Sequence, residues 1–224
     1  MRGFYITSIA LLALATLGFL SLARALDERA ERLQEVGEEL AYLPAAEYLR
    51  PALLGFDHLA ADLFWLRTIQ YFGEHYESDR RYPKLYPLVE LVTSLDPQFV
   101  EAFSFGGLLL TLAKQYPEAI AIYEKGISHN PDRWELPYEL GRVYYLDLHD
   151  HQKVLHWWEL ANRLPNRAPY IPRMVARLYA RTGYRETAIE IWLEMYRTTD
   201  NPQVQEIIEK ELKKLGVSVE EPTE

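Results

Sequence analysis

Three prolines recur at a fixed spacing in the middle of the chain. Pro97, Pro131 and Pro165 follow one another at intervals of 34 residues. Self-similarity at a fixed period of roughly 20 to 50 residues is typical of repeat proteins, in which each unit packs only on its neighbours. The period therefore predicts a linear series of similar units along this part of the chain.

Small residues and aromatic residues also recur within the period. The unit that ends at Pro131 contains Gly107 and Tyr123, and the unit that ends at Pro165 contains Gly141. This pattern resembles the tetratricopeptide repeat family. The resemblance implies an all-α superhelix of tetratricopeptide-type helical hairpins, in which a small residue lets the two helices of a unit approach and a proline ends the second helix.

The resemblance covers residues 66–215 as four units. The first unit begins at Leu66, and the fourth is displaced by one residue, with Ala176 at the small-residue position. The third unit departs from the pattern because Lys153 stands where a small residue is expected. A long charged side chain at that position predicts looser packing between the two helices of the third unit.

A capping helix is expected at the end of the array. Each unit exposes apolar surface at its open end, so repeat arrays normally finish with a helix whose outer face is polar. Residues 202–215 fit this role because their apolar side chains share one side: Val204, Ile207, Ile208, Leu212 and Leu215. Residues 216–224 form a short acidic tail that is expected to be disordered.

The N-terminus contains an uncharged stretch long enough to cross a membrane. Residues Phe4 to Ala23 include 20 positions without a charge, and a helix of that length rises roughly 30 Å, the thickness of a bilayer core. A retained transmembrane helix within residues 1–25 is the favoured interpretation. A cleaved signal peptide is the alternative, because Ala23-Arg24-Ala25 has the form of a cleavage site. A weaker resemblance to a type IV prepilin leader lacks the acidic residue, since Ser8 stands there.

Residues 26–65 connect this stretch to the repeats. Residues 26–43 carry apolar side chains at helical spacing and predict an amphipathic stalk helix, and a second element is expected from Pro51 through Leu66. Short N-terminal tails usually stay in the cytoplasm, although Arg24, Arg29 and Arg32 follow the apolar stretch. We therefore expect a single-pass protein of a bacterial inner membrane with its body on the periplasmic side.

Composition and motifs exclude several classes of function. The formal net charge of −9 argues against nucleic acid as a partner, because binding phosphates needs a basic surface. Without cysteine the chain has no disulfide and no thiolate nucleophile or ligand. It also contains no phosphate-binding glycine loop, nucleophile elbow or His-Glu-x-x-His motif. We therefore expect no enzymatic activity and no cofactor.

Two histidine motifs have ordinary structural interpretations. His149, Asp150, His151 and His156 lie near one turn, where imidazoles and a carboxylate could hold a transition metal. No further ligands follow at a suitable spacing and polar residues are normal in a turn, so no metal site is predicted. His58 and Asp62 are four residues apart and are interpreted as a capping or partner-facing pair.

The resemblance also implies where a partner binds. In similar proteins the first helices of the units line a concave groove that holds an extended peptide or a helix. Carried over to this chain, the predicted partner-binding residues are Phe105, Leu108, Tyr138, Arg142, Tyr145, Arg173, Arg177 and Arg181. The last three stand four apart and form an arginine stripe that suits acidic side chains or a terminal carboxylate. The alternative is that the stripe forms salt bridges with Glu186, Glu190 or the capping helix.

The sequence thus predicts a membrane-tethered scaffold that binds partner proteins in its groove. One alternative is a permanent accessory subunit of a membrane complex, which a convex aromatic patch that includes Trp158 would favour. If the leader is cleaved, the protein would instead be a secreted periplasmic binding protein. An enzyme that uses the histidine cluster would require bound metal.

Overall fold

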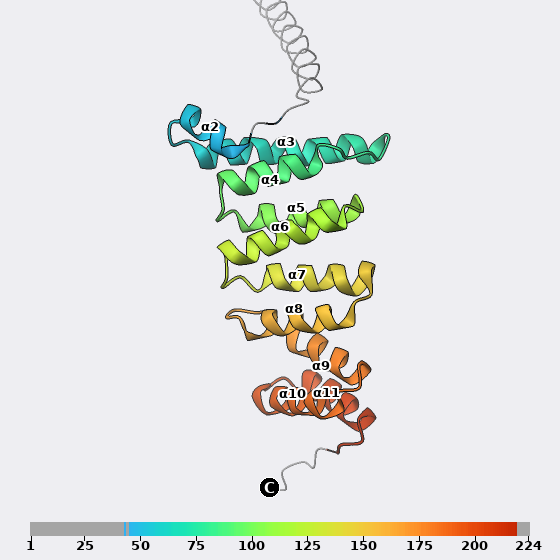
Figure 1. The fold of residues 1–224 in the computed structure, drawn as a ribbon. Coiled ribbons are helices and arrows are strands. Elements are labelled where there is room, and N and C mark those ends of the chain that lie inside the picture. The colour runs from blue at the N-terminus through green and yellow to red at the C-terminus, as the bar shows by residue number, and fades with distance from the viewer. Residues whose placement is uncertain (1–42, 44, 219–224) are drawn as a thin grey trace, which may run out of the picture. The chain divides into compact units, whose positions relative to one another are not determined.

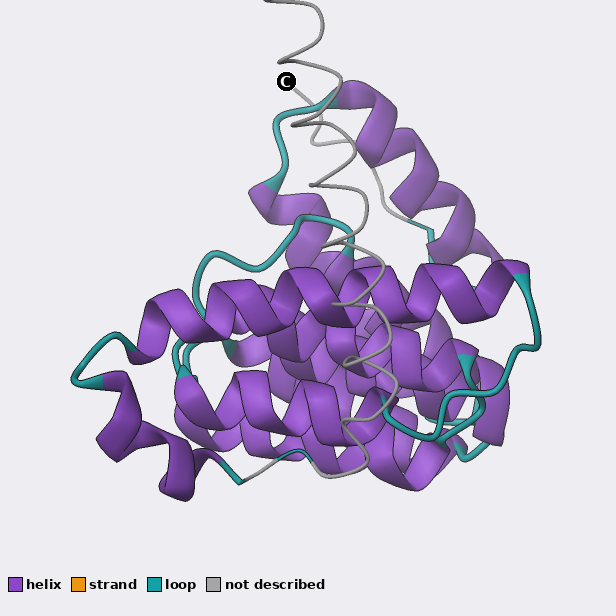
Figure 2. Cartoon of the chain, turned by 90° about the horizontal axis from the view of Figure 1, so that it is seen from above, coloured by secondary structure: helices purple, strands orange, loops and turns teal. Residues whose placement is uncertain are grey.

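The repeat region folds as a series of helices. The computed structural model describes residue 43 and residues 45–218, and this part contains ten α-helices, one π-helical turn and no strand (Figures 1 and 2). The elements are α2 (Ala46–Leu53), α3 (Asp57–Glu77), α4 (Leu85–Leu95), α5 (Val100–Leu112), α6 (Tyr116–His129), α7 (Glu135–Val143), η1 (Tyr144–Leu148), α8 (His151–Arg163), α9 (Ile171–Arg181), α10 (Arg185–Thr198) and α11 (Pro202–Lys214).

Consecutive helices pair as hairpins, and the hairpins stack in chain order. The pairs are α3 with α4, α5 with α6, α7 with α8, and α9 with α10, and α11 packs on the last of them (Figure 1). The all-α hairpin array predicted from the sequence is confirmed for these residues. Within this part of the chain, none of the helices has both the length and the apolar composition of a bilayer span. The predicted anchor (residues 4–23) and the stalk helix lie outside the described residues.

A small residue opposite an aromatic ring holds each of the last three hairpins together. A Cβ atom added at Gly107 would overlap the ring of Tyr123, which is 1% exposed, and one added at Gly141 would overlap the indole of Trp158. In the fourth hairpin Ala176 and Trp192 are buried in the same cluster. These positions are the predicted small residues, and they let the two helices of a hairpin approach closely.

The third hairpin contains one additional residue, which the π-helical turn η1 accommodates. Gly107 and Gly141 are 34 residues apart, whereas their partners Tyr123 and Trp158 are 35 apart. A π-helical turn takes up such an insertion without ending the helix. The same insertion explains why the fourth unit is displaced by one residue, since Gly141 and Ala176 are also 35 apart.

This insertion corrects two expectations for the third unit. Val154, four residues before Trp158, is fully buried at the position that Ala119 holds in the second hairpin. Lys153 is exposed, and its ammonium lies 4.8 Å from the centroid of the Tyr144 ring. The assignment of Lys153 to the interior is therefore wrong. Trp158 is 2% exposed, so it does not contribute to an aromatic surface patch.

Polar side chains connect the first two hairpins. The ammonium of Lys125 on α6 lies 2.7 Å from Glu90 Oε1, and it donates to the hydroxyls of Thr93 and Ser94 at 3.1 and 2.7 Å. In the turn after α6, Asn130 is 4% exposed and donates through Nδ2 to the carbonyl oxygen of Pro97 at 2.9 Å. These bonds fix the position of the second helices relative to each other.

The first hairpin differs from the others. The helix that contains Leu66 begins at Asp57, after a break at Leu54 and Gly55, which both have positive φ. Gly73, which stands 34 residues before Gly107, has no atom within 4 Å of an added Cβ. Tyr71 is buried instead, and its hydroxyl accepts from the backbone N–H of Lys84 at 3.2 Å.

Helix α11 closes the C-terminal end of the stack. The Asn201 side chain accepts from the N–H of Gln203 at 3.0 Å and caps the helix, and Pro202 occupies its first turn. Ile208 and Leu212 are fully buried against Trp192 and Ala176. Charged side chains cover the outer side of the helix, as expected for a cap.

Candidate partner-binding face

The predicted partner-binding residues occupy equivalent positions in successive first helices. Leu108 on α5, Arg142 on α7 and Arg177 on α9 are separated by 34 and 35 residues, which is the spacing of the repeat with its additional residue. None of the eight predicted residues is fully buried. We call the surface formed by these eight residues the open face.

The part of the open face on α5 is apolar. Phe105 is 43% exposed, and its ring meets the ring of Trp65 on α3 edge to face at 6.0 Å. Leu108 is half-buried, and Leu112, one turn further on, is 58% exposed. Because exposed apolar side chains of this size gather at binding sites, this segment suits an apolar side chain of a partner.

In the middle of the open face, Tyr138 and Tyr145 belong to a cluster of five aromatic rings, of which the Trp158 ring is buried. We call these residues the aromatic cluster: Trp134, Tyr138, Tyr145, Trp158 and Tyr170. Each ring contacts at least one other, with centroid distances between 5.3 and 6.3 Å. Aromatic side chains offer large contact areas with few rotatable bonds, and they dominate the energetics of many interfaces.

Tyr138 lies at the centre of the aromatic cluster. Burial, together with the neighbouring Tyr170 hydroxyl, raises the pKa of Tyr138 to about 12, so this side chain is neutral at physiological pH. The Trp158 indole N–H donates to the Tyr138 carbonyl oxygen at 3.1 Å, and the Tyr138 hydroxyl donates to the Met174 sulfur at 3.5 Å. The cluster therefore joins α7, α8 and α9 by polar contacts as well as by stacking.

Two arginines of the stripe line a cavity beside the aromatic cluster. The cavity has a volume of about 200 Å³, and Tyr145, Trp158, Met174, Arg177, Leu178 and Arg181 surround it. Arg181 donates to the Tyr145 hydroxyl at 2.6 Å, and its guanidinium carbon lies 5.9 Å from the centroid of that ring. Arg177 forms an ion pair of 3.1 Å with Glu211 on α11. At Arg177 the structure therefore matches the alternative interpretation, a salt bridge to the capping helix.

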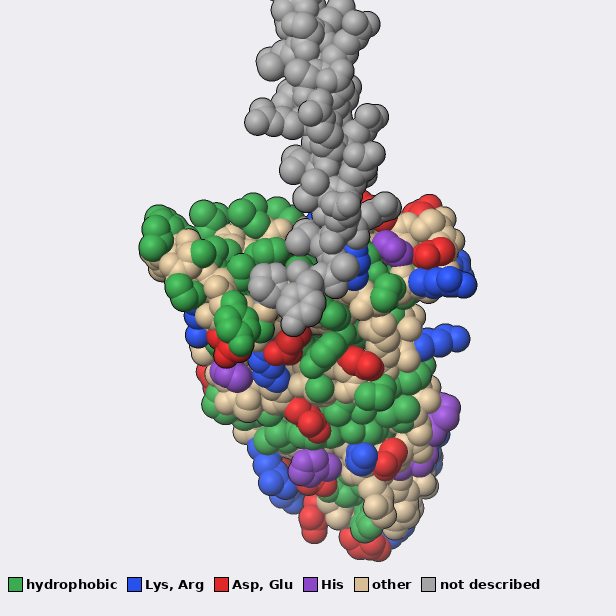
Figure 3. Space-filling view, turned by 45° about the horizontal axis from the view of Figure 1, so that its top comes forward, with side chains coloured by type: hydrophobic (Ala, Val, Ile, Leu, Met, Phe, Trp, Pro, Cys, Tyr) green, Lys and Arg blue, Asp and Glu red, His purple; other side chains and the backbone are tan. Residues whose placement is uncertain are grey.

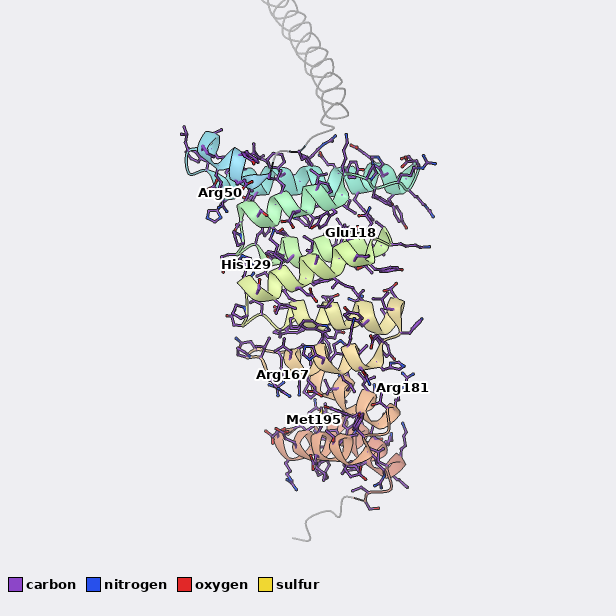
Figure 4. The ribbon with its side chains drawn as sticks, in the orientation of Figure 1. Arg50, Glu118, His129, Arg167, Arg181 and Met195 are labelled. Carbon is purple, nitrogen blue, oxygen red and sulfur yellow. The ribbon has the colours of Figure 1, made fainter. Side chains whose placement is uncertain are left out.

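The other two predicted arginines lie elsewhere. Arg173 lines a separate cavity of about 320 Å³, together with Arg167, Glu194 and Asn162. In Figure 4, Arg167, from the cavity of Arg173, and Arg181, from the cavity beside the aromatic cluster, lie at opposite edges of the stack. The arginine stripe therefore extends from one cavity to the other. Arg142 forms an ion pair of 2.7 Å with Glu139, one turn before it on α7. The structure therefore groups Tyr145, Arg177 and Arg181 but separates them from Arg173.

The histidine motifs have structural contacts. Asp150 caps α8 by accepting from the N–H of Lys153 at 3.1 Å, and His149 has a positive φ of 55° at the end of η1. His58 Nδ1 lies 2.8 Å from Asp96 Oδ2, so His58 pairs with Asp96 rather than with Asp62. Within the described part of the chain, no group of three acidic or histidine side chains is placed to hold a metal ion.

Sequence reasoning missed several residues of this surface. Trp134, Met174 and Leu112 contribute to it but were not predicted, because they lie outside the positions carried over from the repeat family. Trp134 and Tyr170 are 36 residues apart, close to one repeat period, and their shared aromatic character was a usable signal. Arg167 lies in the loop between α8 and α9, where the repeat pattern makes no prediction.

Comparison with known proteins supports no closer assignment. No protein-family model matches the sequence, and no curated protein matches it. The crystal structure of MamA protein aligns with 68% of this chain and 90% of its own, at 14% identity and a TM-score of 0.45. In the structure of Naa15/Naa10 bound to HypK-THB, the matched chain aligns with 73% of this chain and 26% of its own, at 17% identity and a TM-score of 0.46.

Both TM-scores lie below 0.5, so the fold assignment rests on the hairpins themselves. The described part of the chain is a tetratricopeptide-like array of helical hairpins. Its period, its small residues opposite aromatic rings and its polar capping helix are all visible in the structure.

Proposed function

We propose that this chain is a protein-interaction scaffold without catalytic activity, which binds a peptide or a helix of a partner protein along its open face. The observation that supports this most directly is the aromatic cluster beside the cavity of Tyr145, Arg177 and Arg181. A partner segment that presents a carboxylate next to apolar side chains matches this surface. The carboxylate would pair with Arg181, and the apolar side chains would pack on the rings and on Phe105.

The proposal includes a tether to a membrane through residues 4–23. Its support is the length of the uncharged stretch, which equals the length needed for one bilayer span. The body is proposed to lie on the periplasmic side of a bacterial inner membrane. Deletion of residues 1–25 should release the chain from the membrane fraction, and N-terminal sequencing of the mature protein distinguishes a retained anchor from a cleaved signal.

Affinity purification with matched variants tests the open face. Full-length protein is isolated in mild detergent beside Phe105→Glu and Arg181→Glu. Ile207→Glu on α11 and Arg197→Glu on α10 serve as controls, because each changes an exposed side chain of the same kind away from the open face. Arg177 is left unchanged, since its ion pair with Glu211 stabilises the cap. A partner that the two open-face variants lose and both controls retain supports the proposal. Identical partners on all five proteins would refute it.

A further inference from the structure

The N-terminal end of the stack presents apolar side chains to solvent. On α3, Leu59, Leu63 and Leu66 are 55%, 60% and 57% exposed, and Phe56 just before the helix is 66% exposed. In Figure 3 hydrophobic side chains cover much of the surface over α2 and α3. Few soluble proteins leave a row of leucines this exposed, so the surface is expected to contact something.

The opposite end of the stack shows how such an array is normally closed. Helix α11 buries Ile208 and Leu212 and turns Glu206, Glu209 and Lys213 to solvent. Terminal units with a polar outer face keep repeat arrays soluble. Among the described residues, α3 has no such polar helix over its leucine row.

The spacing of the exposed residues on α3 fits one partner helix. Leu59, Leu63, Leu66, Gln70 and Gly73 follow at alternating intervals of four and three residues, which is the heptad spacing of a coiled-coil seam. We call these five residues the α3 seam. All five are exposed, and Gly73 has no atom within 4 Å of an added Cβ, so a second helix has room to approach along the whole row.

The charges beside the α3 seam favour a second copy of the same helix in parallel orientation. In heptad terms Leu59, Leu66 and Gly73 are d positions, so Asp62 is a g position and Arg67 is the following e position. In a parallel pair, g of one helix faces e five residues further on in the other, and Asp62 and Arg67 have this separation. Among the described residues Asp62 forms no ion pair, and Arg67 forms only a 3.6 Å contact with Glu74.

We propose that the α3 seam joins two copies of this chain, with the two α3 helices parallel about a twofold axis that runs along them. Each leucine then packs on its own symmetry mate, and Asp62 pairs with the partner's Arg67 on both sides of the seam. Gln70 occupies an a position, where a polar side chain fixes the register of a coiled coil. The contact closes the open end of each stack by mutual burial and leaves the open face on α5 to α9 free for other partners.

Cysteine crosslinking tests both the contact and its orientation. The natural chain has no cysteine, so one introduced thiol has no partner within its own chain, and a disulfide-linked species of twice the chain mass reports two joined copies. Leu59→Cys and Leu66→Cys in the full-length chain should each form a crosslinked dimer on mild oxidation in the expressing cells. Ala121→Cys, at an exposed position on α6 outside the seam, should form no crosslinked dimer and serves as the control.

A charge exchange tests the pairing of Asp62 with Arg67. Asp62→Arg in the Leu66→Cys background should lower the yield of crosslinked dimer severalfold, because two arginines then oppose each other. Adding Arg67→Asp should restore it. Restoration by the second change distinguishes pairing across the seam from local destabilisation of α3, since each change alone removes a native side chain.

Three results would overturn the proposal. The first is a single-chain mass by light scattering together with no crosslink at residue 59 or 66. The second is a crosslink that forms only between Leu59→Cys and Gln70→Cys copies, which would indicate antiparallel helices. The third is an intramolecular crosslink from residue 66 to a cysteine introduced within residues 26–43. None of these results depends on partner binding at Phe105 and Arg181, so the scaffold function stands or fails separately.

Discussion

At the scale of single residues, the glycines of the hairpins decide how closely two helices approach. A Cβ at Gly141 would overlap the indole of Trp158, which is 2% exposed and donates its N–H to the Tyr138 carbonyl oxygen. Because that ring is fixed by packing and by a hydrogen bond, it cannot move away at low cost. Gly73 holds the corresponding place on α3 but meets no atom within 4 Å.

Substitution by alanine should therefore have opposite effects at these two glycines. Gly141→Ala is expected to lower the free energy of unfolding by about 1–3 kcal/mol, the usual cost of overpacking. Gly73→Ala is expected to raise it by about 0.5–1 kcal/mol, because alanine restricts the unfolded chain and fits an exposed helix. Chemical denaturation monitored by circular dichroism measures both. Equal effects of the two substitutions would contradict this assignment of close contact.

His58 is a second residue whose environment makes a measurable prediction. The hydrogen bond and the charge of Asp96 raise the pKa of His58 above its ordinary value of 6.5, and Asp57 and Asp62 act in the same direction. A raised pKa in the folded state means that the protonated form stabilises the fold. This contribution is fully present below pH 6.5 and is lost as the pH rises through the folded-state pKa.

An NMR titration of the His58 ring measures that pKa directly. In Asp96→Asn the pKa should fall toward 6.5, because the asparagine keeps the shape of the side chain but loses its charge. Asp62→Asn should lower it less, since Asp62 has no hydrogen bond to the ring. If His58 titrates at the same pH in the natural protein and in Asp96→Asn, the ion pair does not exist in solution.

At the scale of elements, the π-helical turn η1 keeps the third hairpin in register despite its additional residue. Removing Leu146, which is 55% exposed within η1, should convert the turn to α-helix and leave Gly141 opposite Trp158. Removing His156 from α8 is the control, because it rotates Trp158 by about 100° away from Val154. Thermal unfolding should show a cooperative transition for the first deletion. Deletion of His156 should lower the free energy of unfolding by about 3–5 kcal/mol, the cost of removing a buried tryptophan side chain.

The sequence contained enough information to predict the hairpins but not their exact register. The sequence indicates Gly107, Gly141 and Ala176 because close helix packing demands small residues, and the structure buries all three. No amino-acid pattern marks the additional residue in η1, because a π-helical turn differs from an α-helix only in its hydrogen bonds. As a result Lys153 was assigned to a position that Val154 occupies.

The candidate site was predictable in position but not in its pairings. The resemblance to the repeat family implied that Tyr138, Arg142 and Arg177 share one face, and Arg142 and Arg177 are equivalent residues of successive units. The alternative of a salt bridge to the capping helix anticipated the element that Arg177 contacts, but nothing in the sequence singled out Glu211 among the charged residues of that helix. The register of α3 was also hidden, because the burial of Tyr71 depends on the chain that follows α3.

At the scale of the whole molecule, a stack of hairpins should unfold from an end that has lost its cap. Leu212 is fully buried on α11, so Leu212→Asp places a charge inside the last cluster and should detach α11. Hydrogen exchange should then show loss of protection in α9 and α10 while α5 and α6 stay protected. Lys213→Ser, at the next and exposed position, should leave both regions unchanged. Uniform loss along the stack would show that the array unfolds as one unit.

The order of side chains along the open face gives the stack a direction. From α5 to α9 the surface changes from Phe105 and Leu108, through the rings of Tyr138 and Tyr145, to the guanidinium of Arg181. A bound segment with an acidic end and an apolar end fits this gradient in one orientation only. In the reverse orientation, the carboxylate of the segment would lie against the apolar side chain of Leu108. If the open face binds such a segment as proposed, the segment lies with its apolar end at α5 and its acidic end at α9.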